Sequence, residues 1–184
     1  MRITKLFLVF FIGFQAQPYA QAYEIPDDVK RILFIGNSIT CAGTYIEYID
    51  AYLSVHYPKQ RHEIINAGLP SETVSGLSEV GHANGEFPRP DLHERLKRVL
   101  DKVKPDLVFA SYGMNDGIYL PHDDKRFKKF KKGIEWLHIE VEKTGAEIIH
   151  ITPTIFRGKN WEAYANVLDI YSDWLILISR YKYC

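Results

Sequence analysis

Residues 31–40 have the sequence Arg-Ile-Leu-Phe-Ile-Gly-Asn-Ser-Ile-Thr. The apolar run that ends at Gly36 is short and uninterrupted, which is typical of a strand buried on both faces of a parallel sheet. Asparagine and serine follow it directly, so polar groups come at the carboxyl end of the strand. In open parallel sheets, ligands bind beyond this end of the strands. The stretch therefore predicts a buried strand that delivers Ser38 to the functional edge of a sheet.

The same alternation of apolar runs and amphipathic segments continues along the chain. Further strands are expected at 63–66, 107–110 and 148–151. Apolar residues at steps of three and four predict the helices between and after them. Strands alternating with helices predict right-handed crossovers and a parallel sheet covered on both faces, which is an α/β fold with three layers. The residues that mark the expected helices are Tyr45, Ile49, Leu53 and His56; Leu92, Leu96, Val99 and Val103; Phe127, Phe130, Ile134, Leu137 and Val141; and Tyr164, Val167, Leu168, Tyr171 and Leu175.

Composition fits one globular domain. The 184 residues include 23 Lys+Arg and 23 Asp+Glu, so the formal net charge is zero. This balance gives no electrostatic footprint for a nucleic acid, and no nucleic-acid partner is expected. Two cysteines, Cys41 and Cys184, match no zinc-ligand spacing, so no metal is expected. Cys41 is expected to be buried in a first helical turn; a second nucleophile or pairing with Cys184 are the alternatives.

The first 22 residues have the order of a secretory signal peptide. Arg2 and Lys5 precede an apolar run of nine residues at 6–14, and Ala20-Gln21-Ala22 follows as a cleavage signal. The run is too short for a membrane span, which needs about 20 residues. An uncleaved anchor or a buried N-terminal strand are the alternatives. We expect cleavage after Ala22, a domain at 23–184 with net charge −2, no membrane span after cleavage, and a secreted or periplasmic location.

Three polar motifs follow the first three strands. Ser38 lies at a strand-to-helix junction, where its hydroxyl can face a cleft, although serine there is commonly a helix cap. Gly68 follows the second strand and lets a backbone N–H approach a ligand, although a tight turn would also use glycine. Asn115 follows the third strand, within a stretch also suited to a turn. Together, the Ser38 and glycine N–H groups and the Asn115 amide could converge as an oxyanion hole.

In this order, the motifs resemble the SGNH (GDSL-like) hydrolase family. The first block of that family is similar to Gly36-Asn37-Ser38-Ile39, with Asn37 where Asp is commoner, and the second matches Gly68. The third block, G-x-N-D, matches residues 113–116. Residues 105–108 and Thr152-Pro153 are also similar, and the resemblance extends over roughly residues 30 to 175.

The resemblance implies a flavodoxin-like three-layer fold and an esterase activity. It implies that Ser38 is the nucleophile, and that the Ser38 N–H, the Gly68 N–H and the Asn115 amide stabilise the oxyanion. Family members cleave esters and thioesters without a metal or cofactor, and secreted bacterial members often remove acetyl groups from carbohydrates. A small-molecule or carbohydrate ester, with acetyl as the acyl group, is therefore the expected substrate. The oligomeric state does not follow from the resemblance.

The fourth block of the family, D-x-x-H, occurs nowhere in the 184 residues. In the family it supplies the base and the acid that orients it. We expect the fifth strand and this loop to be missing, through a fragment or frame-shifted product or through degeneration of the site. His150 near the end of the fourth strand, or His122 beside Asp123 and Asp124, are the candidate substitute bases. The other five histidines, at 56, 62, 82, 93 and 138, have no matching partner in the sequence.

Two other classes of function stay open at this point. One is a catalytically inactive carbohydrate-binding protein that keeps the cleft and uses exposed Tyr and Trp side chains. The other is a nucleotide or flavin binder, which the single glycine of the first loop disfavours. Arg89, between two prolines, would either contact an anionic group of a substrate or stiffen a surface loop.

Overall fold

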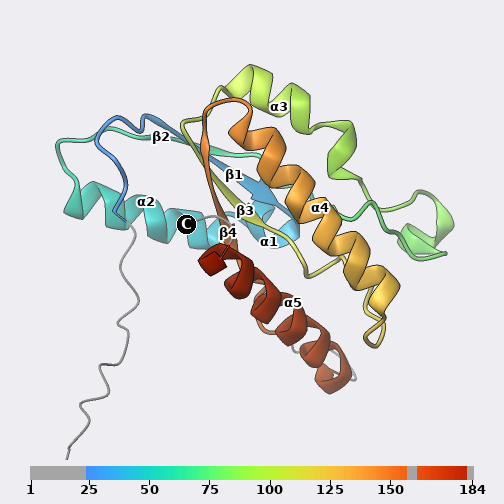
Figure 1. Cartoon of the computed structure of the whole chain (residues 1–184). Coiled ribbons are helices and arrows are strands. Elements are labelled where there is room, and N and C mark those ends of the chain that lie inside the picture. The colour runs from blue at the N-terminus through green and yellow to red at the C-terminus, as the bar shows by residue number, and fades with distance from the viewer. Residues whose placement is uncertain (1–23, 157–160, 182–184) are drawn as a thin grey trace, which may run out of the picture.

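The protein is described by a computed structural model that covers residues 24–156 and 161–181. The expected signal peptide at 1–22 lies outside these residues. The described sheet has four parallel strands in the order β2-β1-β3-β4 (Figure 1). Its strands are β1 (Arg31–Gly36), β2 (Glu63–Asn66), β3 (Leu107–Ser111) and β4 (Glu147–Ile151), which confirms the four strands expected from the sequence.

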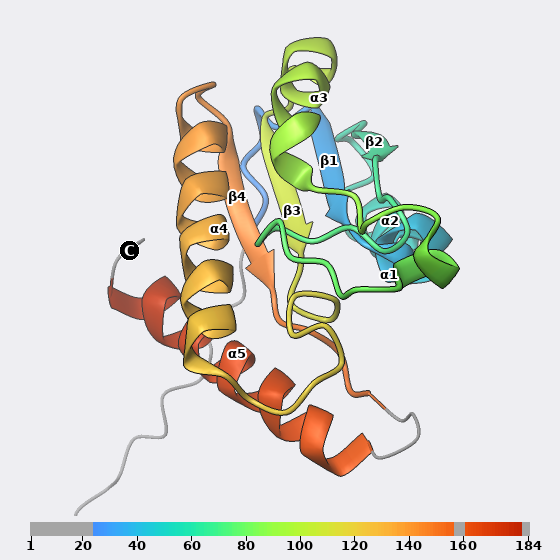
Figure 2. The same cartoon turned by 90° about the vertical axis from the view of Figure 1, so that its right-hand side faces the viewer.

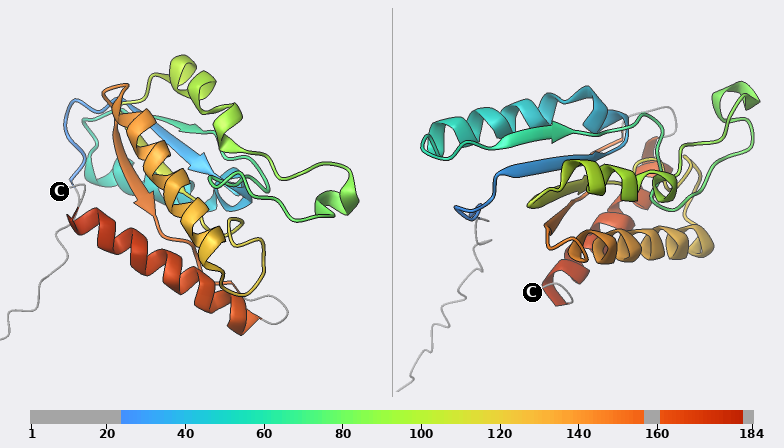
Figure 3. Two further views of the ribbon diagram at one scale, coloured as in Figure 1. Left: turned by 45° about the vertical axis from the view of Figure 1, so that its right-hand side comes forward. Right: turned by 90° about the horizontal axis from the view of Figure 1, so that it is seen from above.

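Helices cover both faces of the sheet, in three layers (Figure 3). One face packs against α2, while α3 and α4 lie on the other face and α5 packs beside α4. No helix of the described segments has the length and apolar character that a membrane span requires. The helices are α1 (Ser38–Ala42), α2 (Thr44–His56), α3 (Leu96–Val103), α4 (Asp124–Glu142) and α5 (Trp161–Tyr181), with 3-10 turns η1 (His82–Gly85) and η2 (Leu92–Glu94).

The alternation of side chains in β1 produces two hydrophobic cores. Ile32 and Phe34 point toward α2, whereas Leu33 and Ile35 point toward α3, α4 and α5, and all four are fully buried. Burial of this kind contributes roughly 1.5–3 kcal/mol for each large apolar side chain. The central strand therefore anchors both layers, and its C-terminal residues are fixed in position.

Aromatic rings join α5 to α4. Tyr171 stacks on Phe130 with ring centroids 4.3 Å apart and on Phe127 at 5.1 Å. The apolar stripe of the long helix predicted this contact surface. Gly133 of the same stripe allows the loop after β2 to approach, because a Cβ there would lie 2.2 Å from the carbonyl oxygen of Val74.

Two sequence predictions differ from the structure, and one helix boundary was not predicted. The helix expected over 92–103 is two elements, η2 and α3, separated at Arg95. Gly43 in the left-handed conformation (φ +80°) separates α1 from α2. The prediction that Cys41 is buried is wrong, because its position on the short α1 turns it to solvent.

The register of the strands brings the ends of β1, β2 and β3 to one edge. Gly36 pairs with Ser111 across β1 and β3, and Phe34 pairs with Asn66 across β1 and β2. Figure 2 shows the strands pointing toward this edge, where α1 and the loops after β2 and β3 lie. The three motifs singled out in the sequence therefore occupy the carboxyl edge of the sheet, as the fold rule predicts.

Candidate active site

Ser38 is the first residue of α1 and is exposed. The preceding residue, Asn37, is buried and caps the helix, since its Oδ1 accepts a hydrogen bond from the N–H of Ile39 at 3.0 Å. Asn37, and not Ser38, is therefore the N-cap of α1, and the Ser38 hydroxyl is not used for capping. Ser38 borders a shallow pocket of about 440 Å³ whose other lining residues are Ile39, Ala42, Thr44, Tyr45 and Tyr48.

Gly68 lies against α1. A Cβ at this position would be 2.3 Å from the backbone nitrogen of Cys41, so only glycine fits. Asn66 ties the same loop to α1, because its Nδ2 donates to the carbonyl of Thr40 at 2.8 Å. The Oδ1 of Asn66 accepts the N–H of Gly68 at 2.9 Å. The N–H that the family resemblance assigns to the oxyanion therefore already has an acceptor here.

Ser71, in the same loop, was not assigned a role from the sequence. Its φ of +66° is left-handed, which is uncommon for a residue other than glycine. Within the described residues, no group accepts a hydrogen bond from its N–H. The left-handed turn follows a proline, Pro70, and that dipeptide is the only sequence signal that could have drawn attention to it.

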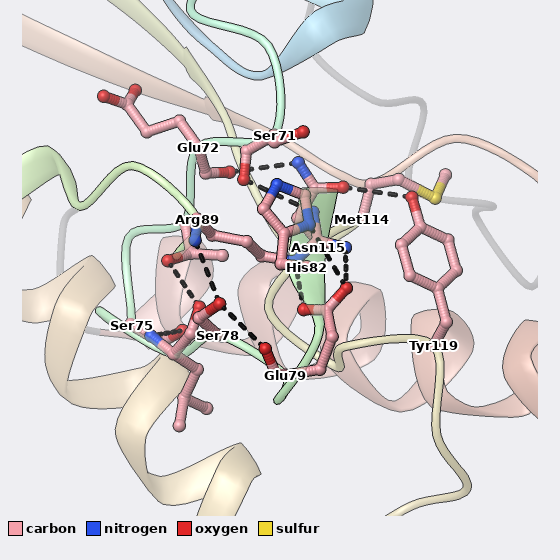
Figure 4. A network of polar contacts seen from close by, with 12 residues as sticks. Ser71, Glu72, Ser75, Ser78, Glu79, His82, Arg89, Met114, Asn115 and Tyr119 are labelled. Carbon is pink, nitrogen blue, oxygen red and sulfur yellow. Dashed lines mark hydrogen bonds and ion pairs between the residues drawn. The ribbon is translucent and has the colours of Figure 1, made fainter. Parts of the chain in front are cut away.

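Asn115 is 3% exposed and both ends of its carboxamide are engaged (Figure 4). Its Nδ2 donates to the carbonyl oxygen of Glu72 at 3.1 Å. Its Oδ1 accepts the hydroxyl proton of Tyr119 at 3.0 Å. The amide is therefore held in one orientation, and one of its two Nδ2 hydrogens is left for another acceptor.

Asp116 joins the loop after β3 to the loop after β2. Its buried carboxylate accepts the N–H groups of Val74 at 3.0 Å, Ser75 at 2.9 Å and Gly113 at 2.8 Å. Burial raises the pKa of this carboxyl, although the hydrogen bonds it accepts favour the ionised form. The structure thus brings Asn115 and the 72–75 segment together, and it brings Gly68 and α1 together.

A buried ion pair supports the carbonyl that holds Asn115. The carboxylate of Glu72 is fully buried and accepts from Arg95 Nε at 2.5 Å and Nη2 at 2.7 Å. Tyr112 donates its hydroxyl to the same carboxylate at 2.6 Å, and Arg95 also donates to the carbonyl of Ala67 at 2.8 Å. This cluster could not be predicted from the sequence, because its members are distant in sequence and no local pattern pairs them.

Arg89 is buried and paired with a carboxylate. It donates to both carboxylate oxygens of Glu79 at 2.6 Å and to the carbonyl of Ser71 at 3.4 Å (Figure 4). Its guanidinium lies over the ring of Tyr119, 5.4 Å from the centroid. Desolvation raises the pKa of Glu79 and the Arg89 hydrogen bond lowers it; the net change is downward. Of the two interpretations of Arg89, the structure favours the stiffened loop.

Several histidines have partners that the sequence did not reveal. His82 lies 3.4 Å from Glu79, His93 lies 2.6 Å from Asp91, and His138 lies 3.3 Å from Glu142. These pairs are local, and none of them includes Ser38. Each partner is within four residues in the chain, so helical or turn spacing could have indicated it.

The two histidines considered as substitute bases have other contacts. His150 packs against α4, where its Nε2 lies 3.3 Å from Nδ1 of His138. Burial lowers the pKa of His150 from 6.5 to about 3. His122 lies at the start of α4, with its Nε2 3.2 Å from Asp124. Neither position shows a contact with Ser38.

Residues 24–156 and 161–181 contain no candidate metal-binding site. No group of three or more His, Cys, Asp or Glu side chains in this part of the chain could hold an ion. What the site offers is an exposed hydroxyl after β1 and an immobilised amide after β3, at neighbouring strand ends. Such an arrangement suits nucleophilic attack with stabilisation of an oxyanion.

Comparison with known proteins found similarity in structure. A scan against family models gave no match, and no curated protein matches in sequence. Axe2, an acetylxylan esterase from Geobacillus stearothermophilus, superposes with a TM-score of 0.63 at 22% identity, over 82% of this chain and 72% of Axe2. LAE5, an α/β hydrolase from the metagenome of Lake Arreo in Spain, gives a TM-score of 0.64 at 22% identity, over 84% of this chain and 74% of LAE5.

Catalytic mutants of Axe2 have been solved in which a serine, an aspartate or a histidine is replaced by alanine. The aspartate and the histidine are three positions apart in that enzyme. At 22% sequence identity, the similarity to Axe2 and LAE5 is a similarity of fold. The chain therefore has the three-layer α/β fold of these hydrolases, with a parallel sheet between two layers of helices.

Proposed function

We propose that this protein is a serine esterase of the SGNH type, with Ser38 as nucleophile. The observation that carries the proposal is the placement of an exposed Ser38 and an immobilised Asn115 at the ends of adjacent strands. In this mechanism the Ser38 oxygen attacks an ester carbonyl, and the alcohol leaves as an acyl-enzyme forms. Water then releases the carboxylic acid and regenerates the hydroxyl.

The oxyanion of each tetrahedral intermediate needs several converging donors. The N–H of Ser38 and the free Nδ2 hydrogen of Asn115 are two of them. Gly68 supplies the third if its N–H leaves Asn66, and the N–H of Ser71 is the alternative third donor. No metal or cofactor takes part in this scheme.

The substrate is proposed to be an uncharged ester, with acetyl as the acyl group and a carbohydrate as the alcohol. Arg89 and Arg95 are the arginines next to the loops of the site, and each is neutralised by a glutamate. Neither is available to bind a carboxylate or phosphate of a substrate. The acetylxylan esterase activity of Axe2 is consistent with a small acyl group on a sugar.

The mechanism also needs a general base. In the SGNH family the D-x-x-H motif supplies it, and residues 1–184 contain no such motif. Without a base, an oxyanion hole and binding alone leave roughly 10³–10⁴-fold catalysis over water. The chain as given is therefore proposed to hydrolyse activated esters slowly. The second candidate function is binding of a carbohydrate ester without turnover.

Hydrolysis of p-nitrophenyl acetate by the full chain tests the proposal. Ser38→Ala should lower the rate to the part that the oxyanion hole and binding supply without a nucleophile, whereas Ser54→Ala, which removes an exposed hydroxyl from α2, should leave the rate unchanged. Equal rates for wild type and Ser38→Ala would contradict the esterase. Saturable binding of an acetylated xylo-oligosaccharide without any Ser38-dependent hydrolysis would favour the binding protein.

Export is proposed from the first 22 residues. If Ala20-Gln21-Ala22 is a cleavage signal, the exported protein begins at Tyr23. N-terminal sequencing of protein from the periplasm or medium tests this. A mature product that still begins at Met1 would contradict it.

A further inference from the structure

The amide of Asn115 can serve an oxyanion only if its nitrogen, and not its oxygen, faces the reacting carbonyl. A carboxamide is nearly symmetric in shape, so its hydrogen-bond partners decide which way round it lies. The carbonyl of Glu72 accepts from Nδ2 at 3.1 Å, and the hydroxyl of Tyr119 donates to Oδ1 at 3.0 Å. The Glu72 carbonyl can only accept, so it specifies this orientation. The Tyr119 hydroxyl then donates to the oxygen that this orientation presents, and so holds the amide in place.

The backbone that carries Tyr119 is strained. Ile118 and Tyr119 both adopt the left-handed conformation, with φ of +49° and +55°. For a β-branched residue such as Ile118 this is an outlier, and such strain persists only where surrounding contacts over-determine it. Those contacts include the N–H of Ile118, which donates to the carbonyl of Asn115 at 2.9 Å. The strain thus occurs in the turn that directs Tyr119 toward Asn115.

The ring of Tyr119 is held by a cation–π contact and a stacking contact. Arg89 lies over it at 5.4 Å, and Tyr164 stacks against it with centroids 4.9 Å apart. Tyr164 in turn donates its hydroxyl to the carbonyl of Met114 at 2.6 Å. Although 42% of Tyr119 is exposed, its hydroxyl is directed at Asn115 (Figure 4). The ring position, and with it the hydroxyl, is fixed by groups on three separate segments.

We propose that Tyr119 is a positioning residue, whose hydroxyl holds the Asn115 carboxamide with its free N–H presented to the oxyanion. The inference rests on the proposed function for the role of Asn115. Oxyanion stabilisation depends on donors that need no reorganisation when the charge develops. Burial raises the pKa of Tyr119, so the hydroxyl keeps its proton at neutral and mildly alkaline pH.

Tyr119→Phe in the full chain tests this, because it removes the hydroxyl and keeps the ring between Arg89 and Tyr164. The control is Tyr52→Phe, which removes a hydroxyl from an exposed tyrosine on α2. The first readout is the pair of side-chain NH₂ signals of Asn115 in ¹H–¹⁵N spectra, assigned by their loss in Asn115→Asp. A hydrogen bond to Oδ1 strengthens the double-bond character of the amide C–N bond. Tyr119→Phe should therefore shift both signals and speed their exchange.

The second readout is hydrolysis of p-nitrophenyl acetate. An interaction made only with the developing oxyanion lowers kcat and leaves KM unchanged when it is lost. We expect Tyr119→Phe to lower kcat about tenfold, less than the 10²–10³-fold loss of a whole oxyanion donor, because Asn115 itself remains. Tyr52→Phe should change neither kcat nor the Asn115 signals.

Unchanged Asn115 signals in Tyr119→Phe would overturn the proposal outright. Changed signals with an unchanged kcat, in a protein whose turnover depends on Ser38, would overturn the catalytic consequence. If Ser38→Ala leaves hydrolysis intact, the esterase itself is contradicted, and the positioning role in catalysis falls with it. The NH₂ signals would then still show whether Tyr119 holds Asn115, so the two failures are distinguishable.

Discussion

Glu72 contributes twice to the candidate site, through its carboxylate and through its backbone carbonyl. The carboxylate holds Arg95, and the carbonyl accepts from Asn115. In Glu72→Gln, Arg95 would keep its charge with 17% of its side chain exposed and no carboxylate beside it. Breaking a buried pair costs about 3–5 kcal/mol, and partial exposure of Arg95 reduces the expected loss of unfolding free energy to about 2–3 kcal/mol. Urea unfolding measures this loss.

The matched control is Asp101→Asn, which breaks the pair between Lys97 and Asp101 on the surface of α3. Exposed pairs of this kind contribute roughly 0–1 kcal/mol. The account would be wrong if Glu72→Gln were as mild as Asp101→Asn. A double variant, Glu72→Gln with Arg95→Met, should recover part of the stability, because no unpaired charge is then left in the pocket.

Gly68 tests the contact between the second motif and α1. Alanine there would place Cβ 2.3 Å from the nitrogen of Cys41, and this backbone cannot move without displacing the turn that carries Ser38. We expect Gly68→Ala to lower the unfolding free energy by about 1–3 kcal/mol, the usual cost of overpacking. The control is Gly145→Ala. No atom lies within 4 Å of its new Cβ, so only the left-handed φ of +84° is unfavourable for alanine.

Thermal unfolding distinguishes the two glycine variants. Gly145→Ala should cost about 1 kcal/mol. If Gly145→Ala lowered the unfolding free energy more than Gly68→Ala, packing against α1 would not be the reason for glycine at position 68.

At the scale of single residues, the sequence predicts where the motifs lie but not what holds them. Ser38 and Asn115 could be placed at one edge because each follows a buried run, and the ends of parallel strands meet. The pairing of Glu72 with Arg95 could not be predicted, since the two residues meet only through the fold. The general tendency of cysteine to be buried predicts an interior Cys41, whereas in the structure Cys41 lies on the exposed side of α1.

At the scale of elements, the contact between β4 and α4 predicts that the free energy of unfolding depends on pH. Burial lowers the pKa of His150 from 6.5 to about 3, and His138 of α4, itself paired with Glu142, is its neighbouring titratable group. Below pH 6.5 the unfolded chain binds a proton that folded His150 does not bind. The contribution of neutral His150 to stability is therefore complete above this pH and is lost as pH falls toward 3.

The slope expected from this one group approaches about 1.4 kcal/mol per pH unit. His150→Leu should reduce the loss of stability between about pH 7 and pH 5, measured by urea unfolding at each pH. His56→Leu, the same change on the exposed face of α2, should not. Parallel stability curves for wild type and His150→Leu over this range would contradict the burial of a neutral histidine.

The elements themselves were predictable where their pattern is simple. Strands β1 and β3 contain nearly uninterrupted apolar runs, β2 and β4 each have a pair of isoleucines at their centre, and the stripe of α4 is a sustained helical period. The break at Arg95 was not predictable, because the apolar spacing continues through it. Arg95 leaves the helical pattern at the position where its side chain reaches Glu72.

At the scale of the whole molecule, the layered fold could be predicted from alternation alone, and the superposition with Axe2 and LAE5 agrees with it. The register that places Gly36 opposite Ser111 could not, because apolar runs of similar length can pair in several ways. In the folded molecule, the residues of the candidate site are held by contacts between distant segments. Two hydrophobic cores fix β1, and the loops after β2 and β3 are bonded to one another through Asp116.

The central claim, that Ser38 is the nucleophile, is tested most directly by locating the acyl group. The full chain is mixed with p-nitrophenyl acetate, quenched in acid, digested and analysed by mass spectrometry. The account predicts acetylation of the peptide that contains Ser38, at a far higher fraction than of the peptide that contains Ser54. It also predicts that Ser38→Ala abolishes the signal. Equal, low acetylation of the two peptides, with hydrolysis still catalysed, would contradict it.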